Sequence, residues 1–360
     1  MDSPIQPLRV AHLISGDLWA GAEVASFHLL VALAQRSDVE VRLVSLNPGE
    51  LVDRIRSADI KVTVVPENDR TFWSLAREVR LQLTDVDLIH AHGYKENLLA
   101  SLSGRPWLCT QHGRPEPHRG AAALRMGVYA ALDGFAQRWS ARRVIAVSQE
   151  VAEWVARRAG AQRTVLCWNG IADPAHRLRP VPWAERPVRV GTLGRLSPVK
   201  GLELAVDAVA GCPGLELEIV GAGPELQLLA NRIAAREAGD RIHLMGHIAD
   251  PLPRVAAWRA LLVTSFHEGN PIGVMEALAL GTPVVSTPLR GVAEILDGNG
   301  GQLESGRDPT EWASDLRRLL VDRDRGRALS QAARERYREA FSATAVADRM
   351  VGIYDDAMTR

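Results

Sequence analysis

The chain contains little cysteine and no long apolar run. Its three cysteines, Cys109, Cys167 and Cys212, are far apart in 360 residues, which argues against a disulfide framework or a zinc knuckle and fits a reducing cytoplasm. No apolar run is long enough to span a bilayer. The N-terminus also lacks the basic and apolar regions of a signal peptide. We therefore expect a cytoplasmic protein, for which only peripheral contact with the inner face of a membrane is left open.

Lysine is scarce enough to make single positions informative. Only three of the 43 basic residues are lysines, namely Lys61, Lys95 and Lys200, so a surface cation in this chain is normally an arginine. Lys200 lies in a loop next to a glycine, and its rarity favours a specific role. The formal net charge is zero, which gives the whole molecule no strong attraction to nucleic acid.

Charge is uneven in one region, residues 105–163, which contains ten arginines and four acidic residues. This local excess fits a docking face for an anionic acceptor or for an anionic membrane surface. Solvated helix faces are the simpler explanation, and all of these alternatives stay open.

Strand and helix patterns alternate along the whole chain, which indicates parallel sheets with helices on both faces. Four prolines interrupt residues 172–187, and we take 176–187 as an interdomain linker. The predicted fold is α/β, with two doubly wound Rossmann-like domains that face each other across a cleft. The domains are 1–175 and 188–341. Strands are expected at 9–14, 41–46, 61–65, 88–90, 106–110, 143–147, 164–168, 188–193, 215–220, 242–245, 260–263 and 283–286.

Two cations follow the first expected strand of the second domain. Gly194, Arg195 and Lys200 stand in a loop that leads into a helix. Arginine can meet phosphate with two hydrogen bonds, and lysine acts as a point charge, so the loop suits a diphosphate without requiring a metal. A plain strand–helix turn with two surface charges is the alternative.

Two glutamates flank a short loop that runs into an apolar helix. Glu268 and Glu276 stand on either side of Gly269, Asn270, Pro271, Ile272 and Gly273. A helix beginning near Gly273 directs its free amides at the loop and favours a phosphate there. Glu276 can accept hydrogen bonds from vicinal ribose hydroxyls, and Glu268 can reach a sugar. Helix-dipole complementation and a solvated loop acid are the alternatives.

Other strand ends carry weaker signals. Gly221 and Gly223 form a lone Gly-x-Gly that does not continue into a dinucleotide fingerprint, which leaves a tight turn near a ligand. Gly16 and Gly21 would let backbone approach a ligand closely. His247 is placed at the edge of a nucleobase pocket.

Histidines mark the ends of two strands in the first domain. We expect the side chains of His90 and His92 on opposite faces of their strand, which disfavours a shared metal site, and we assign His92 to the cleft. His112 is a similar residue at the end of the next strand. Ser148 is a helix N-cap by default and an anion site for an acceptor phosphate as the alternative.

These motifs resemble those of glycosyltransferase family 4, a large family of retaining enzymes with the GT-B fold. The matching segments are GAE at 21–23, HAHG at 90–93, VIAVS at 144–148, WNGI at 168–171, GRLSPVKG at 194–201, VGAGPE at 220–225 and HEGNPIGVMEALALGTPVVST at 267–287. They span nearly the whole chain in the family's order. The chain departs from the family pattern at Ala20, Trp168 and Arg290, and Arg290 would alter the sugar pocket.

The resemblance implies specific roles. Catalysis would use His92, Arg195, Lys200 and Glu268. The donor would be a nucleoside diphosphate sugar, with a uridine diphosphate sugar favoured, and no divalent metal or other cofactor is expected. The C-terminal helix, 342–360, would cross back onto the first domain after a break near Phe341. The residues assigned to donor binding are Gly16, Gly21, Gly194, Gly223, His247, Asn270, Pro271, Ile272, Gly273 and Glu276. Those assigned to acceptor binding are His112, Arg114 and Ser148.

The predicted activity is transfer of a sugar with retained anomeric configuration to a hydroxyl of a glycan, a lipid-linked or another glycoconjugate acceptor. No carboxylate is placed as a covalent nucleophile, so we expect same-face substitution in which the departing phosphate deprotonates the acceptor. A sugar-nucleotide epimerase on the same scaffold and a catalytically silent sugar-nucleotide binder are the alternatives. The oligomeric state does not follow from the sequence.

Overall fold

The protein is described by a computed structural model that covers residues 6–17, 19–113, 121–298, 300–303 and 306–359. The chain divides into two compact units. The first unit combines Met1–Ala172 with Ala343–Arg360, and the second is Asp173–Ser342. Each unit is built on its own parallel sheet, as the alternating pattern predicted.

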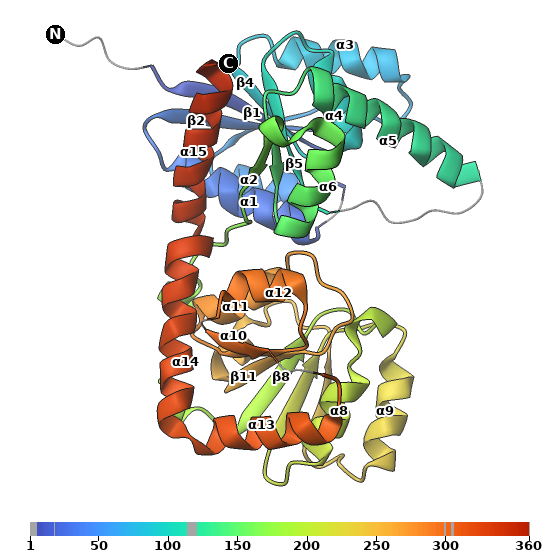
Figure 1. The fold of residues 1–360 in the computed structure, drawn as a ribbon. Coiled ribbons are helices and arrows are strands. Elements are labelled where there is room, and N and C mark those ends of the chain that lie inside the picture. Colours follow the sequence, from blue (N-terminus) through green and yellow to red (C-terminus); the bar gives the residue numbers. More distant parts are fainter. Residues whose placement is uncertain (1–5, 18, 114–120, 299, 304–305, 360) are drawn as a thin grey trace, which may run out of the picture. The chain divides into compact units, whose positions relative to one another are not determined.

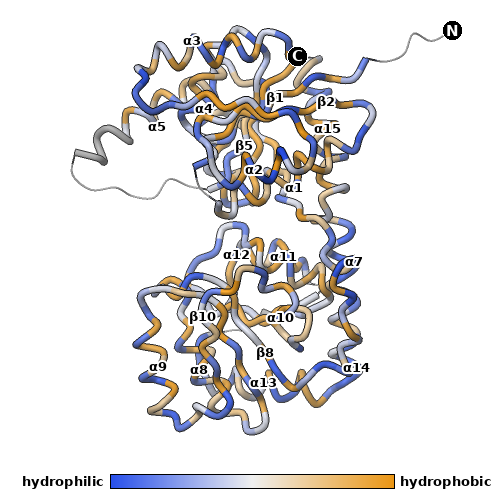
Figure 2. The backbone as a smooth tube through the Cα atoms, turned by 180° about the vertical axis from the view of Figure 1, so that it is seen from behind, coloured by the Kyte–Doolittle hydropathy of each residue, from blue (hydrophilic) through white to orange (hydrophobic). Residues whose placement is uncertain are grey.

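The first unit contains a seven-stranded sheet of order β3-β2-β1-β4-β5-β6-β7. All its pairings are parallel, and the central strands are mostly apolar, as the orange stretches near β1 and β5 show in Figure 2. The carboxyl ends of β1, β4 and β5 therefore lie side by side, where loops lead into helices. Its elements are β1 (Leu8–Ile14), α1 (Gly21–Ala34), β2 (Val39–Ser45), α2 (Glu50–Ser57), β3 (Lys61–Val64), α3 (Phe72–Gln82), β4 (Leu88–Ala91), α4 (Tyr94–Ser101), β5 (Trp107–Gln111), α5 (Ala121–Trp139), β6 (Val144–Ala146), α6 (Gln149–Ala159), the 3-10 turn η1 (Ala161–Arg163), β7 (Thr164–Leu166) and α15 (Ala343–Thr359).

The C-terminal helix α15 belongs to this first unit and packs against α1 (Figure 1). A π-helical turn, Tyr337–Phe341, and the extended Ser342 separate α15 from α14. The amide of Ala343 donates to the carbonyl oxygen of Ile171 at 2.8 Å, which fixes the start of the helix. Met350 and Tyr354 are buried in the core of the unit.

The second unit contains a six-stranded sheet of order β10-β9-β8-β11-β12-β13, again with parallel pairings. β13 has no counterpart among the predicted strands because it is only three residues long and lies in a glycine-rich stretch. The elements are α7 (Ala175–Leu178), the 3-10 turn η2 (Trp183–Glu185), β8 (Arg189–Leu193), η3 (Pro198–Lys200), α8 (Glu203–Ala210), β9 (Glu216–Val220), α9 (Leu226–Ala235), β10 (Ile242–Gly246), α10 (Leu252–Ala257), β11 (Ala260–Val263), α11 (Ile272–Ala279), β12 (Val284–Ser286), α12 (Arg290–Leu296), β13 (Gly301–Leu303), α13 (Pro309–Val321) and α14 (Arg323–Arg336).

The segment predicted as a linker, 176–187, lies within the second unit, and the boundary between the units falls after Ala172. Trp183 is buried, and its indole nitrogen donates to the carbonyl oxygen of Arg259 at 2.8 Å. Arg186 is also buried and donates to four acceptors: Val181 O, Trp258 O, Leu280 O and Thr282 Oγ1. The prolines leave only short helical turns here, α7 and η2, and the contacts of Trp183 and Arg186 hold the segment on the second unit.

Candidate functional site

The loops after β8 and β9 pack tightly on each other in the second unit. Leu196 N donates to Ala222 O at 3.0 Å, and Gly194 N donates to Val220 O at the same distance. A Cβ at Gly221 would overlap the carbonyl oxygen of Gly194, and a Cβ at Gly223 would overlap that of Leu196. These glycines are therefore required by loop packing, which also brings the predicted donor residues Gly194 and Gly223 together.

Lys200 and Glu268 meet although 68 positions separate them in the chain. Lys200 Nζ donates to Glu268 Oε1 at 2.6 Å, and Ser265 Oγ donates to the same oxygen at 2.6 Å. The side chain of Glu268 is 12% exposed and that of Lys200 is 26% exposed, so the pair is partly shielded from solvent. Two of the four predicted catalytic residues are thus in direct contact.

Arg195 is exposed at the start of the same loop. Among the described residues it has no hydrogen-bond or ion-pair partner, unlike most arginines of this unit. A cation without a partner next to the Lys200–Glu268 pair can accept an anionic ligand without first breaking a contact of its own.

The loop after Glu268 leads into the N-terminus of α11. Pro271 precedes the helix, and no side chain caps it. A Cβ at Gly273 would meet only Leu193 Cδ2 within 4 Å, at 3.6 Å. The first amides of a helix have no acceptor within the helix and suit an anion, and the donor role predicted for Asn270, Pro271, Ile272 and Gly273 stays a prediction.

Glu276 lies one turn further along α11. Burial, with a smaller effect from Asp250, raises the pKa of its carboxyl to about 7. No hydrogen-bond or ion-pair partner for this carboxyl occurs in the part of the chain that the structure describes. A partly buried acid without a partner is costly unless a ligand supplies donors, and two ribose hydroxyls would do so.

Arg307 is a residue that the sequence pattern did not point to. Its guanidinium group lies 3.9 Å from the centre of the Phe266 ring and donates to the carbonyl oxygens of Thr264 and Ser265. It thereby supports the strand end that carries Ser265 and Glu268. In the sequence Arg307 is one arginine in an irregular stretch, and no pattern there predicts that it supports the site.

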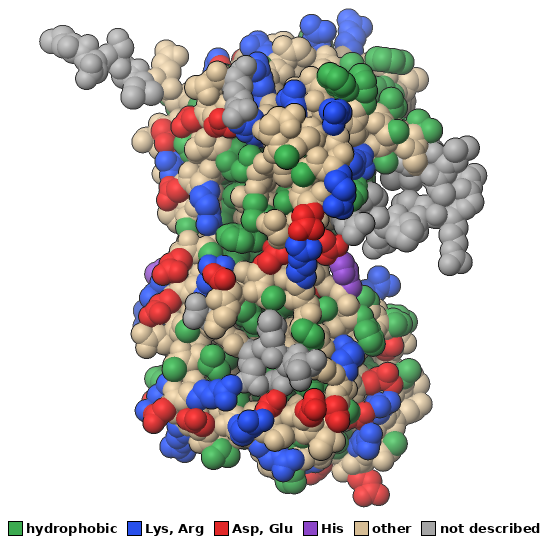
Figure 3. Space-filling model, viewed as in Figure 1, with side chains coloured by type: hydrophobic (Ala, Val, Ile, Leu, Met, Phe, Trp, Pro, Cys, Tyr) green, Lys and Arg blue, Asp and Glu red, His purple; other side chains and the backbone are tan. Residues whose placement is uncertain are grey.

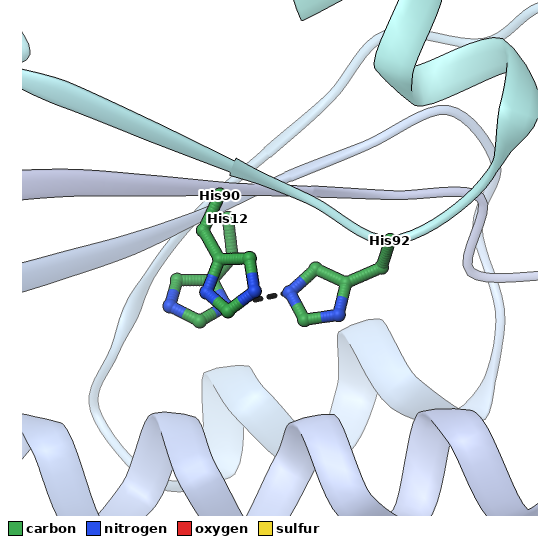
Figure 4. A group of neighbouring side chains, drawn as sticks. All are labelled: His12, His90 and His92. Carbon is green, nitrogen blue, oxygen red and sulfur yellow. Dashed lines mark hydrogen bonds between the residues drawn. The ribbon is translucent and has the colours of Figure 1, made fainter. Parts of the chain in front are cut away.

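The first unit carries a cluster of histidines at the carboxyl ends of β1, β4 and β5 (Figure 4). The rings of His90 and His92 stack with their centres 4.2 Å apart. The prediction that these two side chains point to opposite faces is wrong, because successive residues alternate and residues two apart share one face. His12 completes the group, and ligand nitrogens of the three lie within 4.8 Å of one another.

The nitrogens of these three histidines are all engaged in hydrogen bonds. His12 Nδ1 lies 3.0 Å from His92 Nε2, and its Nε2 lies 3.1 Å from the Tyr354 hydroxyl. His90 contacts the same hydroxyl through Nδ1 and Thr110 Oγ1 through Nε2. The geometry is that of a hydrogen-bonded chain, and a metal would have to displace several of its links.

The contacts of Ser26 decide which nitrogen donates and which accepts in each of these hydrogen bonds. Its hydroxyl donates to Ala22 O at 2.8 Å, so it can only accept from His92 Nδ1, which lies 3.3 Å away. His92 therefore carries its proton on Nδ1 and accepts at Nε2 from His12 Nδ1–H. The same rule makes the Tyr354 hydroxyl donate to His12 Nε2 and accept from His90 Nδ1–H.

His112 is the last member of this series of hydrogen-bonded histidines. Its Nε2 lies 3.1 Å from His92 Nδ1, so it accepts there and carries its own proton on Nδ1. This Nδ1 is shielded from solvent and has no partner among the described residues. His92 and His112 line a cavity of about 20 Å³ together with Thr110 and Asn169, which is room for one water molecule.

Burial keeps the whole cluster neutral. It lowers the pKa of His12 to about 3 and that of His112 to about 4, and it places the pKa of His90 and His92 well below the usual range. Hydrogen bonds between neutral rings then require one fixed tautomer at each position.

The remaining predicted residues occupy separate places. Gly16 has a φ of +83°, and a Cβ there would overlap Ser45 Oγ, while Gly21 begins α1. Ser148 caps α6 through a 3.3 Å bond from Val151 N and is buried, so the structure shows its default role. His247 is exposed after β10, and Arg114 lies outside the described residues.

Two parallel-sheet units, one with a charged loop at the N-terminus of α11, define the class as glycosyltransferases of the GT-B fold. The family model "Glycosyl transferases group 1" matches residues 178–336, and the model "Glycosyltransferase Family 4" matches residues 19–173. The chain belongs to glycosyltransferase family 4.

Curated relatives match over part of their length. A D-inositol 3-phosphate glycosyltransferase of Corynebacterium efficiens is 34% identical over 187 residues, which are 47% of this chain and 43% of the relative. A 2-deoxystreptamine N-acetyl-D-glucosaminyltransferase of Streptomyces fradiae is 29% identical over 241 residues, or 58% and 56% of the two chains. The matched segments thus span about half the length of these relatives.

Solved structures match along nearly the whole chain. HepE of Anabaena in complex with UDP aligns with a TM-score of 0.81 at 21% identity and covers 97% of this chain and 100% of that one. The complex of HepE with UDP-glucose aligns with a TM-score of 0.76 at 22% identity, covering 97% and 99%. At this identity the likeness establishes the fold.

No helix among the described residues is long and apolar enough to cross a bilayer.

Proposed function

We propose that this protein is a retaining glycosyltransferase that moves a sugar from a uridine diphosphate sugar to an acceptor hydroxyl. The acceptor would be a glycan, a lipid-linked sugar or another glycoconjugate, and the reaction would take place in the cytoplasm without a divalent metal. One observation carries the proposal: Lys200, Glu268 and the uncapped start of α11 lie together in the second unit.

The charges at this place fit a nucleoside diphosphate. Arg195 has no partner among the described residues, and Lys200 has one that a ligand can replace. These two cations and the first-turn amides of α11 would bind the diphosphate. Glu276 would accept hydrogen bonds from the ribose. The likeness in fold to HepE, whose structures contain UDP and UDP-glucose, supports this assignment.

The Lys200–Glu268 contact gives the site a specific resting state. With the donor bound, the ammonium group would turn to the phosphate oxygens and release Glu268 Oε1, which Ser265 still holds. Glu268 would then accept a hydrogen bond from a hydroxyl of the transferred sugar. Because Lys200 and Glu268 would each exchange one partner for another, neither charge would be left without compensation.

The chemical step would be a same-face substitution. The bond between the anomeric carbon and the phosphate oxygen breaks, a bond to the acceptor oxygen forms on the same face, and the acceptor proton passes to the departing phosphate. Arg195, Lys200 and the end of α11 stabilise the negative charge that develops on that phosphate. His92, whose pKa burial lowers well below the usual range, would stay neutral and would not serve as the base for this step.

Turnover without an acceptor tests this proposal. Incubation with uridine diphosphate glucose in the presence of a chelator should release UDP slowly, and proton NMR should show the α-anomer of glucose as the first product. Lys200→Ala and Glu268→Ala should each lower the rate at least about tenfold. Formation of a different nucleotide sugar instead of free sugar would identify an epimerase. Calorimetric binding without turnover over many acceptors would identify a silent binder.

A further inference from the structure

Helix α5 exposes an apolar face to solvent, whereas an ordinary surface helix buries its apolar face. Val128, Leu132, Phe135 and Trp139 follow one another at spacings of four, three and four, which places them on one face. Their exposed fractions are 54%, 50%, 65% and 65%. Tyr129 beside them is also exposed, and green side chains gather over α3 and α5 in Figure 3.

The opposite face of the same helix is polar and buried. Asp133 and Gln137 have no exposed surface. Asp133 Oδ1 accepts from Asn97 Nδ2 at 2.7 Å, and Oδ2 accepts from Gln137 Nε2 at 2.9 Å. This network attaches α5 to α4 and fixes the orientation of the helix, so the apolar face cannot simply turn inward.

Charge on the outer face favours an anionic partner. Among the described side chains of α5, Arg138 is the exposed ionic group, and the acid of the helix, Asp133, is buried. Arg138 lies 5.8 Å from the centre of the Trp139 ring, and Arg142 stands three residues after the end of the helix. The region 105–163 as a whole carries ten arginines against four acidic residues. A lipid surface with anionic headgroups complements this combination.

The residue types and the exposed area of this face of α5 fit a lipid surface better than a second protein chain. Tyr129 and Trp139 belong to the residue types that are enriched at membrane–water interfaces. The five apolar side chains expose on the order of 500 Å², less than the roughly 800 Å² per partner of a standard protein–protein interface. The stripe from 128 to 139 is about 17 Å long, which suits a helix lying in the headgroup region but not one that spans a bilayer.

We propose that the outer face of α5, formed by Val128, Leu132, Phe135, Arg138 and Trp139, docks on an anionic phospholipid surface. The docking would bring the first unit to the membrane without insertion of a spanning segment. It does not depend on the donor site in the second unit and holds whether or not the transfer reaction is as proposed.

Sedimentation with vesicles tests the docking on the full chain. Wild-type protein should bind vesicles of phosphatidylglycerol mixed with phosphatidylcholine and should bind phosphatidylcholine alone much more weakly. The double variant Leu132→Gln/Phe135→Gln should lose at least about tenfold in affinity, because two apolar side chains no longer enter the lipid. Arg138→Gln should lose about fivefold on anionic vesicles only.

A matched control comes from exposed apolar residues elsewhere. Leu226 and Val321 of the second unit are 47% and 81% exposed, and the double variant Leu226→Gln/Val321→Gln should bind vesicles like the wild type. Far-ultraviolet circular dichroism and the thermal midpoint verify that all variants fold. The proposal is overturned if the wild type binds neither vesicle, if the α5 variant binds as well as the wild type, or if the stripe instead holds a dimer that the variant dissociates.

Discussion

Single residues in the second unit divide into charges that are paired and charges that await a partner. Lys200 and Glu268 compensate each other, while Glu276 has no partner among the described residues and has a raised pKa. On ligand binding Glu268 would give up its contact with Lys200, whereas Glu276 would gain hydrogen bonds. We therefore expect opposite behaviour of the two glutamates.

Removal of the Lys200 ammonium group should weaken the binding of UDP. A hydrogen bond to a charged group contributes about 1.5–3 kcal/mol, so Lys200→Ala should raise the Kd by roughly ten- to a hundredfold in calorimetry. Lys95→Ala is the matched control, since Lys95 pairs with Glu67 in the first unit. Equal affinity of Lys200→Ala and wild type would exclude the diphosphate role.

The raised pKa of Glu276 makes donor binding pH-dependent. Its pKa of about 7 in the folded protein lies above the usual value of 4.5, so between these pH values the folded protein binds more protons than the unfolded chain, and stability falls as the pH rises. Ribose hydroxyls that donate to the carboxylate favour its ionised form. Binding of UDP-glucose, whose diphosphate does not titrate near pH 6, should therefore release protons at that pH, which calorimetry in buffers of different ionisation enthalpy measures. Glu276→Gln should abolish the release.

The charged residues of this site could be predicted from the sequence, whereas the contacts that they make could not. Lys200 was recognisable by the scarcity of lysine, and Glu268 and Glu276 by the loop between them. The contact of Lys200 with Glu268 depends on the pairing of β8 with β11, which local pattern does not give. Arg307 reaches the site from an irregular stretch, so no periodicity could reveal it.

At the scale of elements, the loop 268–271 is held from behind by α12. A Cβ at Gly291 would overlap the carbonyl oxygens of Glu268 and Gly269, so only glycine allows the helix to approach the loop this closely. By contrast, a Cβ at Gly269 would meet no atom within 4 Å. The two glycines therefore differ in what they contribute, although they look alike in the sequence.

Gly291→Ala should displace the loop and weaken donor binding, whereas Gly269→Ala should not. We expect at least about a tenfold higher Kd for UDP-glucose in the first variant, because a shift of a few tenths of an ångström or more disrupts charged hydrogen bonds. Calorimetric titration of both variants measures the difference. Similar affinities for the two would show that α12 does not position the loop.

Strands were predicted with nearly the observed bounds, while the orientation of individual side chains was not. Lys61–Val64 and Ala260–Val263 agree with the apolar runs to within one residue. His90 and His92 share a face because the strand period is two, and the missing partner His12 comes from β1, 78 positions away from His90. Register between distant strands decides such clusters, and a single sequence does not contain it.

For the whole molecule, the histidine chain connects the first sheet to the C-terminal helix through Tyr354. The hydroxyl bridges His12 and His90, so helix α15 contributes a link inside the core of the first unit. Alternation predicted two sheets, but the attachment of α15 to the first unit followed only from the resemblance to family 4. No pattern within 343–359 specifies which unit its apolar face covers.

The buried neutral histidines should make the protein sensitive to acid. Their pKa values in the folded protein lie below the usual value of 6.5, so the unfolded chain binds more protons, and stability falls as the pH drops below 6.5. His12→Phe should reduce this pH slope of the unfolding free energy by up to about 1.4 kcal/mol per pH unit, measured by urea unfolding between pH 7 and 5. An unchanged slope in this variant would contradict the assignment of His12 as a buried neutral histidine.

The central claim is that the second unit binds a nucleoside diphosphate sugar at Lys200, Glu268 and Glu276. A thermal-shift screen of nucleotides and nucleotide sugars on the wild type and on Glu276→Gln tests it most directly, since binding to the folded state raises the apparent stability. We expect a shift with UDP and UDP-sugars, a small shift or none with uridine alone, and a reduced shift in the variant. No shift with any nucleotide, or equal shifts in variant and wild type, would contradict it.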